Sequence, residues 1–151
     1  MKRKFSLFLA LMMALNLCAI PTSASSPEVT QETETIYTEE YGEVRVETIL
    51  TVYPATARSH TRSADKTKNY YAGDTKIATV TLSATFGYDW VGSWVDEASS
   101  SYSTYDGWSY KNESISTSGS TAKLSAKLTK LLYSSHSVSI SLKCTADGTI
   151  S

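Results

Sequence analysis

The chain has 151 residues, with 14 lysines and arginines, 15 aspartates and glutamates, and a formal net charge of −1. This balance excludes the strongly basic footprint of a nucleic-acid-binding protein, so no nucleic acid is expected as a partner. The two cysteines and two histidines form no Cys/His cluster, and the sequence contains no HExxH, GxSxG or phosphate-loop motif. We therefore predict a non-enzymatic protein with no catalytic residues, no metal site and no cofactor.

The first 24 residues predict export. A basic MKRK stretch precedes the apolar residues 5–20, and the small-residue pattern Thr22-Ser23-Ala24 follows. This order is typical of a secretory signal peptide cleaved near Ala24. The apolar stretch is shorter than the ~20 residues that a spanning helix needs. A secreted, extracellular protein with no stable membrane span after cleavage is expected.

Removal of the signal peptide leaves one modest domain, with acidic charge concentrated at its start. Residues 25–50 carry seven glutamates and one arginine, whereas residues 51–151 carry ten basic and eight acidic residues. We expect a disordered leader at 25–33, an acidic hairpin and linker at 34–66, and a β-sandwich domain at 67–151. An alternative is that residues 25–53 form a removable pro-segment that masks the basic remainder.

Alternating side chains predict the first strands. EVRVETILTVY (43–53) places Val44, Val46, Thr48, Leu50 and Val52 on one face, and ETIYTEE before it could pair with it through a turn at Tyr41-Gly42. Pro54 ends this strand, and the small, polar and basic residues 55–67 predict a linker or long loop. KIATVTLSATFGY (76–88) is the clearest strand, because its apolar side chains alternate with Thr and Ser on a wet face.

Eight aromatic residues fall between Phe86 and Tyr110, among them all three tryptophans of the chain. Phe86 and Tyr88 continue an inward face, and Trp108 is expected to join them in the core. Trp90, Trp94 and Tyr105 lie beside Gly, Asp and Ser, which indicates turns near the surface. These three are the candidate ligand-binding aromatics, suited to stacking on sugar rings or to contact with a protein partner.

The C-terminal part predicts a hairpin. STAKLSAKLTKLLY (120–133) fits both a strand and an amphipathic helix, and a helix with its lysine row would favour a membrane-active, bacteriocin-like protein. SVSISLKC (137–144) alternates strictly, which favours two paired strands. Cys144 is the only thiol left after signal cleavage, so no internal disulfide is possible. It is expected either to be buried on its strand or to form an intermolecular disulfide.

Several of these stretches resemble small exported β-rich proteins of Gram-positive gut bacteria. The likeness covers the runs KIATVTLSATFGY, ASSSYSTYDGWSYKNESISTSGSTAK and SVSISLKCTADGTIS, with EEYGEVRVET and YPATARS upstream. The resemblance implies export and a β-fold, and it implies no activity. That pattern also includes a second cysteine after the aromatic turn, where this chain has GSWVDEASS and no cysteine.

We predict an all-β chain with a single small antiparallel β-sandwich. The function expected first is that of a secreted, non-enzymatic interaction or accessory protein with an unknown extracellular protein or glycan as partner. The alternatives are a glycan- or cell-wall-binding module that uses Trp90, Trp94 and Tyr105, and the membrane-active protein.

Overall fold

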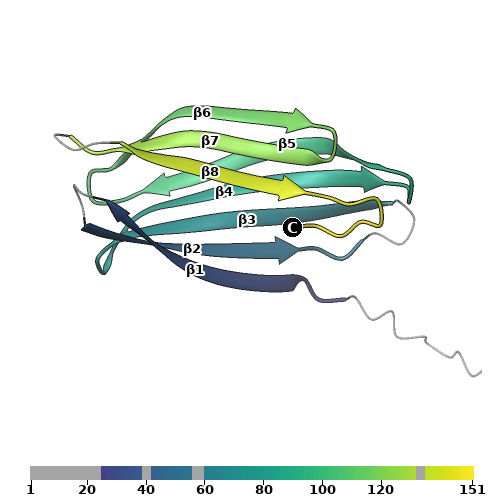
Figure 1. Cartoon of the computed structure of the whole chain (residues 1–151), viewed down its shortest axis with the longest axis horizontal. Coiled ribbons are helices and arrows are strands. Elements are labelled where there is room, and N and C mark those ends of the chain that lie inside the picture. Colours follow the sequence, from purple (N-terminus) through teal and green to yellow (C-terminus); the bar gives the residue numbers. More distant parts are fainter. Residues whose placement is uncertain (1–24, 39–41, 56–59, 132–134) are drawn as a thin grey trace, which may run out of the picture.

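The computed structural model describes residues 25–38, 42–55, 60–131 and 135–151 (Figure 1). The predicted signal peptide lies outside these residues. The described residues form strands and turns without a helix, which confirms the predicted all-β class. The strands are β1 (Glu28–Thr38), β2 (Gly42–Val52), β3 (Thr61–Ala72), β4 (Thr75–Tyr88), β5 (Ser93–Thr104), β6 (Ser109–Ser118), β7 (Thr121–Thr129) and β8 (His136–Lys143).

The strands form two antiparallel sheets that pack as a sandwich (Figure 1). The first sheet has the order β1-β2-β3-β4-β5, and the second has the order β6-β7-β8. Every strand pairs with its neighbour in the chain except at the step from β5 to β6, where the chain passes from one sheet to the other. The result is a simple up-and-down meander folded over on itself.

The core lies between the sheets and uses the alternation predicted from the sequence. Val46 in β2, Leu82 and Phe86 in β4, Leu124 in β7 and Leu142 in β8 are all fully buried. Burying such a side chain contributes about 1.5–3 kcal/mol. The intervening residues of β7 and β8 are exposed Lys and Ser and half-exposed Thr, so strand periodicity decides which side chains of each strand reach the core.

The structure differs from the predicted organisation of the N-terminal half. Residues 28–33, expected in a disordered leader, lie in β1, and residues 61–66, expected in a linker, lie in β3. β2 pairs with β3 from Val44↔Ala72 to Val52↔Ala64, so the strand residues 34–38, 42–52 and 61–66 belong to the same sheet as β4 and β5. The polar composition of β3 resembles that of a loop. One face of the strand is exposed to solvent, and the other carries lysines at the open side of the sandwich.

The helical alternative for residues 120–133 is wrong over the described residues 120–131. These residues contain β7, the central strand of the second sheet, paired on both sides. The membrane-active hypothesis therefore loses the amphipathic helix on which it depended. Among the described residues, no helix is long and apolar enough to cross a membrane.

Candidate functional site

Trp94 lies near the start of β5 on the outer face of the five-stranded sheet, opposite Gly87 of β4. Its indole covers the backbone of Gly87 so closely that a Cβ there would lie 2.4 Å from the ring. The indole Nε1 donates a hydrogen bond of 2.8 Å to Asp96 Oδ1. The side chain is nevertheless 45% exposed. One side of the ring is thus fixed against the sheet, while the rest of it faces solvent.

A polar hollow of about 230 Å³ lies on the same outer face of the sheet, and Trp94 is not one of the residues that line it. Thr85 pairs with Glu97 and Gly87 pairs with Trp94, so the hollow begins one pleat away from the ring. Its polar lining consists of Ser63, Asp65, Ser83, Thr85, Glu97 and Ser99. The hollow therefore offers hydroxyl groups and two carboxylates next to an aromatic plane.

Hydrogen bonds orient part of this lining. Ser63 Oγ and Thr85 Oγ1 lie 2.9 Å apart across β3 and β4. Tyr53 Oη donates to Asp65 Oδ2 over 2.8 Å, and the hydrogen bond to the Asp65 carboxylate raises the pKa of that tyrosine. The Asp65 carboxylate thus keeps free lone pairs for a ligand, while its direction is set by its neighbour.

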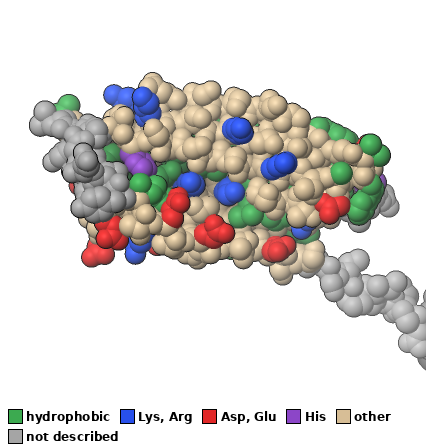
Figure 2. All heavy atoms as spheres, viewed as in Figure 1, with side chains coloured by type: hydrophobic (Ala, Val, Ile, Leu, Met, Phe, Trp, Pro, Cys, Tyr) green, Lys and Arg blue, Asp and Glu red, His purple; other side chains and the backbone are tan. Residues whose placement is uncertain are grey.

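Trp90 and Val91 form the tip of the turn between β4 and β5. Trp90 is 69% exposed, Val91 is 92% exposed, and Trp90 has a φ of 68°, which is uncommon for a bulky residue. The turn is held by the Trp90 N–H on the Ala146 carbonyl (2.9 Å) and by the Val91 N–H on Asp89 Oδ1 (3.0 Å). Figure 2 shows apolar side chains gathered at this end of the molecule, where β4 ends.

Tyr105 is not part of this cluster. It follows the other end of β5, where its N–H donates to the Ile77 carbonyl and Lys76 Nζ lies 5.9 Å from its ring centroid. Eleven strand residues at ~3.3 Å each separate it from Trp94 by about 36 Å. The structure therefore brings the two predicted tryptophans to one end of the sandwich and places the predicted tyrosine, which is 45% exposed, at the opposite end.

Cys144 lies directly after β8 and is only 1% exposed. It forms an antiparallel bridge with Ile150, and its Sγ donates to the Thr145 carbonyl at 3.4 Å. Burial, with the Asp147 charge adding to it, raises the pKa of the thiol. The thiol is therefore protonated and enclosed, as one of the two sequence interpretations predicted, and in this fold it is not presented to a thiol of another molecule.

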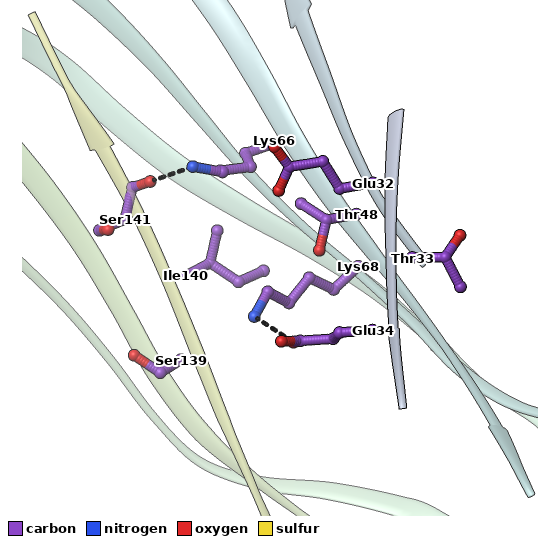
Figure 3. Close-up of a pocket in the computed structure, with 9 residues that line it drawn as sticks. All are labelled: Glu32, Thr33, Glu34, Thr48, Lys66, Lys68, Ser139, Ile140 and Ser141. Carbon is purple, nitrogen blue, oxygen red and sulfur yellow. Dashed lines mark hydrogen bonds and ion pairs between the residues drawn. The ribbon is translucent and has the colours of Figure 1, made fainter. Parts of the chain in front are cut away.

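A charged groove of about 250 Å³ runs along the open side of the sandwich between β1 and β8 (Figure 3). Lys66 Nζ donates to the Ser141 carbonyl of β8 at 3.1 Å, and Lys68 Nζ lies 3.7 Å from Glu34 Oε1. Burial, reinforced by the charge of Lys68, lowers the pKa of Lys66. Both lysine ammonium groups have partners within the protein. The groove therefore accommodates Lys66 and Lys68 on the inner side of β3.

Trp94 was predicted from the sequence, but the polar groups around it were not. The Gly87–Trp94 pair was detectable in principle, because a tight turn centred on Trp90 and Val91 sets that register. Asp65 was not predicted as a site residue because residues 55–67 were expected to form a linker. The extra residue at the register shift opposite Thr85 and Phe86, where Asp96 lies, has no signal in a single sequence. No cluster of metal-binding side chains occurs among the residues that the structure describes.

The fold defines a two-sheet antiparallel β-sandwich with an aromatic and polar site on one outer face. Comparisons with protein-family models, curated proteins and solved structures found no match for the chain. The function is therefore inferred from the geometry of the site itself.

Proposed function

We propose that this chain is an exported, non-enzymatic saccharide-binding protein. Its binding surface, here called the Trp94 face, consists of Trp94 and the hollow lined by Ser63, Asp65, Ser83, Thr85, Glu97 and Ser99. The observation that carries the proposal is an indole held by Gly87 and Asp96 at the margin of a hydroxyl- and carboxylate-lined hollow. Export rests on the predicted signal peptide.

A sugar ring matches this surface chemically. One side of a pyranose is lined with C–H groups that pack on an aromatic plane, and its edge carries hydroxyls that hydrogen-bond to carboxylates and to Ser and Thr. Because the indole is already fixed, little rotamer entropy is lost on binding. The charged groups of the hollow are the acids Asp65 and Glu97, which favours neutral or amino sugars over anionic ones.

The test compares two aromatic residues that are exposed to the same extent. Trp94 and Tyr105 are each 45% exposed but lie at opposite ends of β5. We expect Trp94→Ala to weaken retention on neutral polysaccharides at least tenfold, equivalent to about 1.4 kcal/mol, and Tyr105→Ala to leave it unchanged. Binding is measured on a glycan array and by affinity electrophoresis, with thermal unfolding of both variants as the check on folding.

Because Trp94→Ala uncovers Gly87, a second variant separates binding from stability. Glu97→Gln keeps the shape of the hollow and the indole in place, and is expected to weaken binding while leaving the unfolding midpoint unchanged. Retention of every tested saccharide by both variants at the level of the unaltered protein would overturn the proposal.

A protein partner is the second candidate, favoured by the tip of Trp90 and Val91. A strained, hydrogen-bonded turn that presents two apolar side chains is typical of a contact point. In this case cell-surface retention is expected to fall with Trp90→Ser and not with Trp94→Ala, and the glycan array is expected to show no binding.

A further inference from the structure

The outer face of the three-stranded sheet has a composition unlike the rest of the molecule. Residues of β6, β7 and β8 that point away from the core in the paired register are serine, threonine or lysine. The lysine face is defined by the four exposed lysines Lys111, Lys123, Lys127 and Lys143. No acidic, aromatic or apolar side chain shares this paired outward register, whereas exposed Asn112 and Glu113 occupy the bulge of β6 between Lys111 and Ser114. Over β7 and β8, Figure 2 shows lysines among tan side chains.

The lysines of this face lack compensating charges. Among the described residues, none of the four takes part in an ion pair. The chain's other described lysines do have partners: Lys66 the Ser141 carbonyl, Lys68 Glu34, Lys130 Asp106, and Lys76 the rings of Tyr71 and Tyr105. Within the described part of the chain, positive charge without an ion-pair or ring partner is therefore concentrated on one face, although the overall charge is slightly negative.

This arrangement works against stability. Lys111 lies directly opposite Lys127 in the β6–β7 register, and Lys143 lies opposite Thr121, diagonal to Lys123. Like charges directly opposite each other on a sheet are destabilising. The two lysine doublets are four residues apart along β7, or about 13 Å. The face therefore carries two positively charged pairs of lysines, spaced along the direction of β7.

We infer that the lysine face binds a linear polyanion, and that this polymer is a chain of phosphodiester-linked polyols. Lysines act as point charges toward phosphate, and the absence of arginine from the face argues against bidentate recognition of one discrete anion. The serine and threonine rows between the doublets supply hydroxyls for the polyol oxygens. A flexible polymer can follow the strand and contact both doublets.

Other anionic partners fit the face less well. Single-stranded nucleic acids use aromatic side chains for base stacking, and the face has none. A membrane-surface site needs apolar side chains that enter the lipid, and these are also missing from the outward register. Because the lysine face and the Trp94 face lie on different sheets, this inference does not depend on the proposed function.

The experiment measures binding of purified polyglycerol phosphate to the protein at 50 and 200 mM salt. Neutralising four phosphates gives an expected slope of log K against log salt of about −3, at ~0.7 per phosphate. The double variant Lys123→Gln/Lys127→Gln is expected to weaken binding at least tenfold at 50 mM salt and to reduce the slope by about 1.4. Its unfolding midpoint should be unchanged or higher, because like-charge repulsion is removed.

The matched control Lys76→Gln/Lys130→Gln removes the same charge elsewhere and is expected to keep the affinity and the slope. Trp94→Ala is also expected to keep them, which separates this site from the saccharide site. The inference is overturned by absence of binding at 50 mM salt or by equal weakening in the control. Tighter binding to a polyuronate, to single-stranded DNA or to anionic vesicles also overturns it.

Discussion

At the scale of single residues, the end of the molecule near the Trp94 face depends on close packing against glycine. Gly148 has a φ of 84°, and a Cβ there would lie 2.6 Å from the Tyr88 ring. Arg62 Nη1 donates to the Gly148 carbonyl at 3.2 Å, so β3 and the C-terminal turn meet at the same point. A side chain at this position would both strain the backbone and displace an aromatic ring.

Gly148→Ala is therefore expected to be markedly more destabilising than Gly73→Ala. Gly73 also has a positive φ, 59°, but a Cβ there would meet nothing within 4 Å. Backbone strain alone costs about 1 kcal/mol, whereas the added clash raises the expected cost of Gly148→Ala to about 2–4 kcal/mol. Urea unfolding of the two variants measures the difference. Equal losses would show that Tyr88 moves aside without cost.

Residue-scale prediction from the sequence was best where burial alone decides the outcome. Phe86 and Trp108 are buried, Tyr88 is half-buried, and Trp90, Trp94 and Tyr105 are exposed. Flanking Gly, Asp and Ser residues indicated the exposed positions, but Trp108 has similar neighbours and is buried. Which of these exposed residues lie close together in space could not be predicted from the sequence. Whether Tyr105 joins the two tryptophans depends on strand length and direction, and β5 places it at the far end.

At the scale of secondary-structure elements, alternation identified β2, β4 and β8, because each has one side in the core, and β7 was predicted from its expected pairing with β8. β3 was missed because alternation is not visible in its composition. Its inner side includes Lys66 and Lys68, which reach the edge of β8 and Glu34 instead of being buried in an apolar layer. A strand on the open side of a sandwich therefore has the composition of a loop.

β8 also contains a histidine whose pKa differs between the folded and unfolded chain, so the sign of its effect on stability can be derived. His136 begins the strand and packs edge-on against Tyr70, with ring centroids 5.4 Å apart. Burial lowers the pKa of His136, and the charge of Lys68 lowers it further. The neutral ring is thus favoured in the folded protein, while the unfolded chain binds a proton near the ordinary value of about 6.5.

Between the unfolded and the folded pKa of His136, the unfolded chain binds more protons, so stability falls as the pH is lowered through this window. Above pH 6.5 the contribution is constant. We expect the free energy of unfolding of His136→Gln to change less between pH 7 and pH 5.5 than that of the unaltered protein. Ser137→Ala, at an exposed position of β8 without an ionisable side chain, is the control and should keep the full dependence. An unchanged pH dependence in His136→Gln would contradict the role of this histidine.

At the scale of the whole molecule, the two sheets share one core, and the predicted division between residues 34–66 and 67–151 does not divide it. Val46 of β2 and Leu124 of β7 are both fully buried in the same apolar cluster, although one lies in the supposed acidic hairpin and the other in the supposed sandwich domain. The change of charge sign along the chain suggested two units. Charge is a property of the outer faces, however, and the inner faces determine what folds together.

We therefore expect a single cooperative unfolding transition for all described strands. Val46→Ala and Leu124→Ala should each lower the free energy of unfolding, by about 1–3 and 2–5 kcal/mol respectively, and each should shift the whole transition. Far-ultraviolet circular dichroism reports on both sheets, and fluorescence reports on Trp90, Trp94 and Trp108, none of which lies in β1 or β2. The two signals should coincide in both variants.

Val91→Ala, at a site that is 92% exposed, is the control and should change stability by less than about 0.5 kcal/mol. If Val46→Ala instead produced an early, separate transition in circular dichroism without a change in fluorescence, β1 and β2 would be an independent unit and the shared core would not be cooperative.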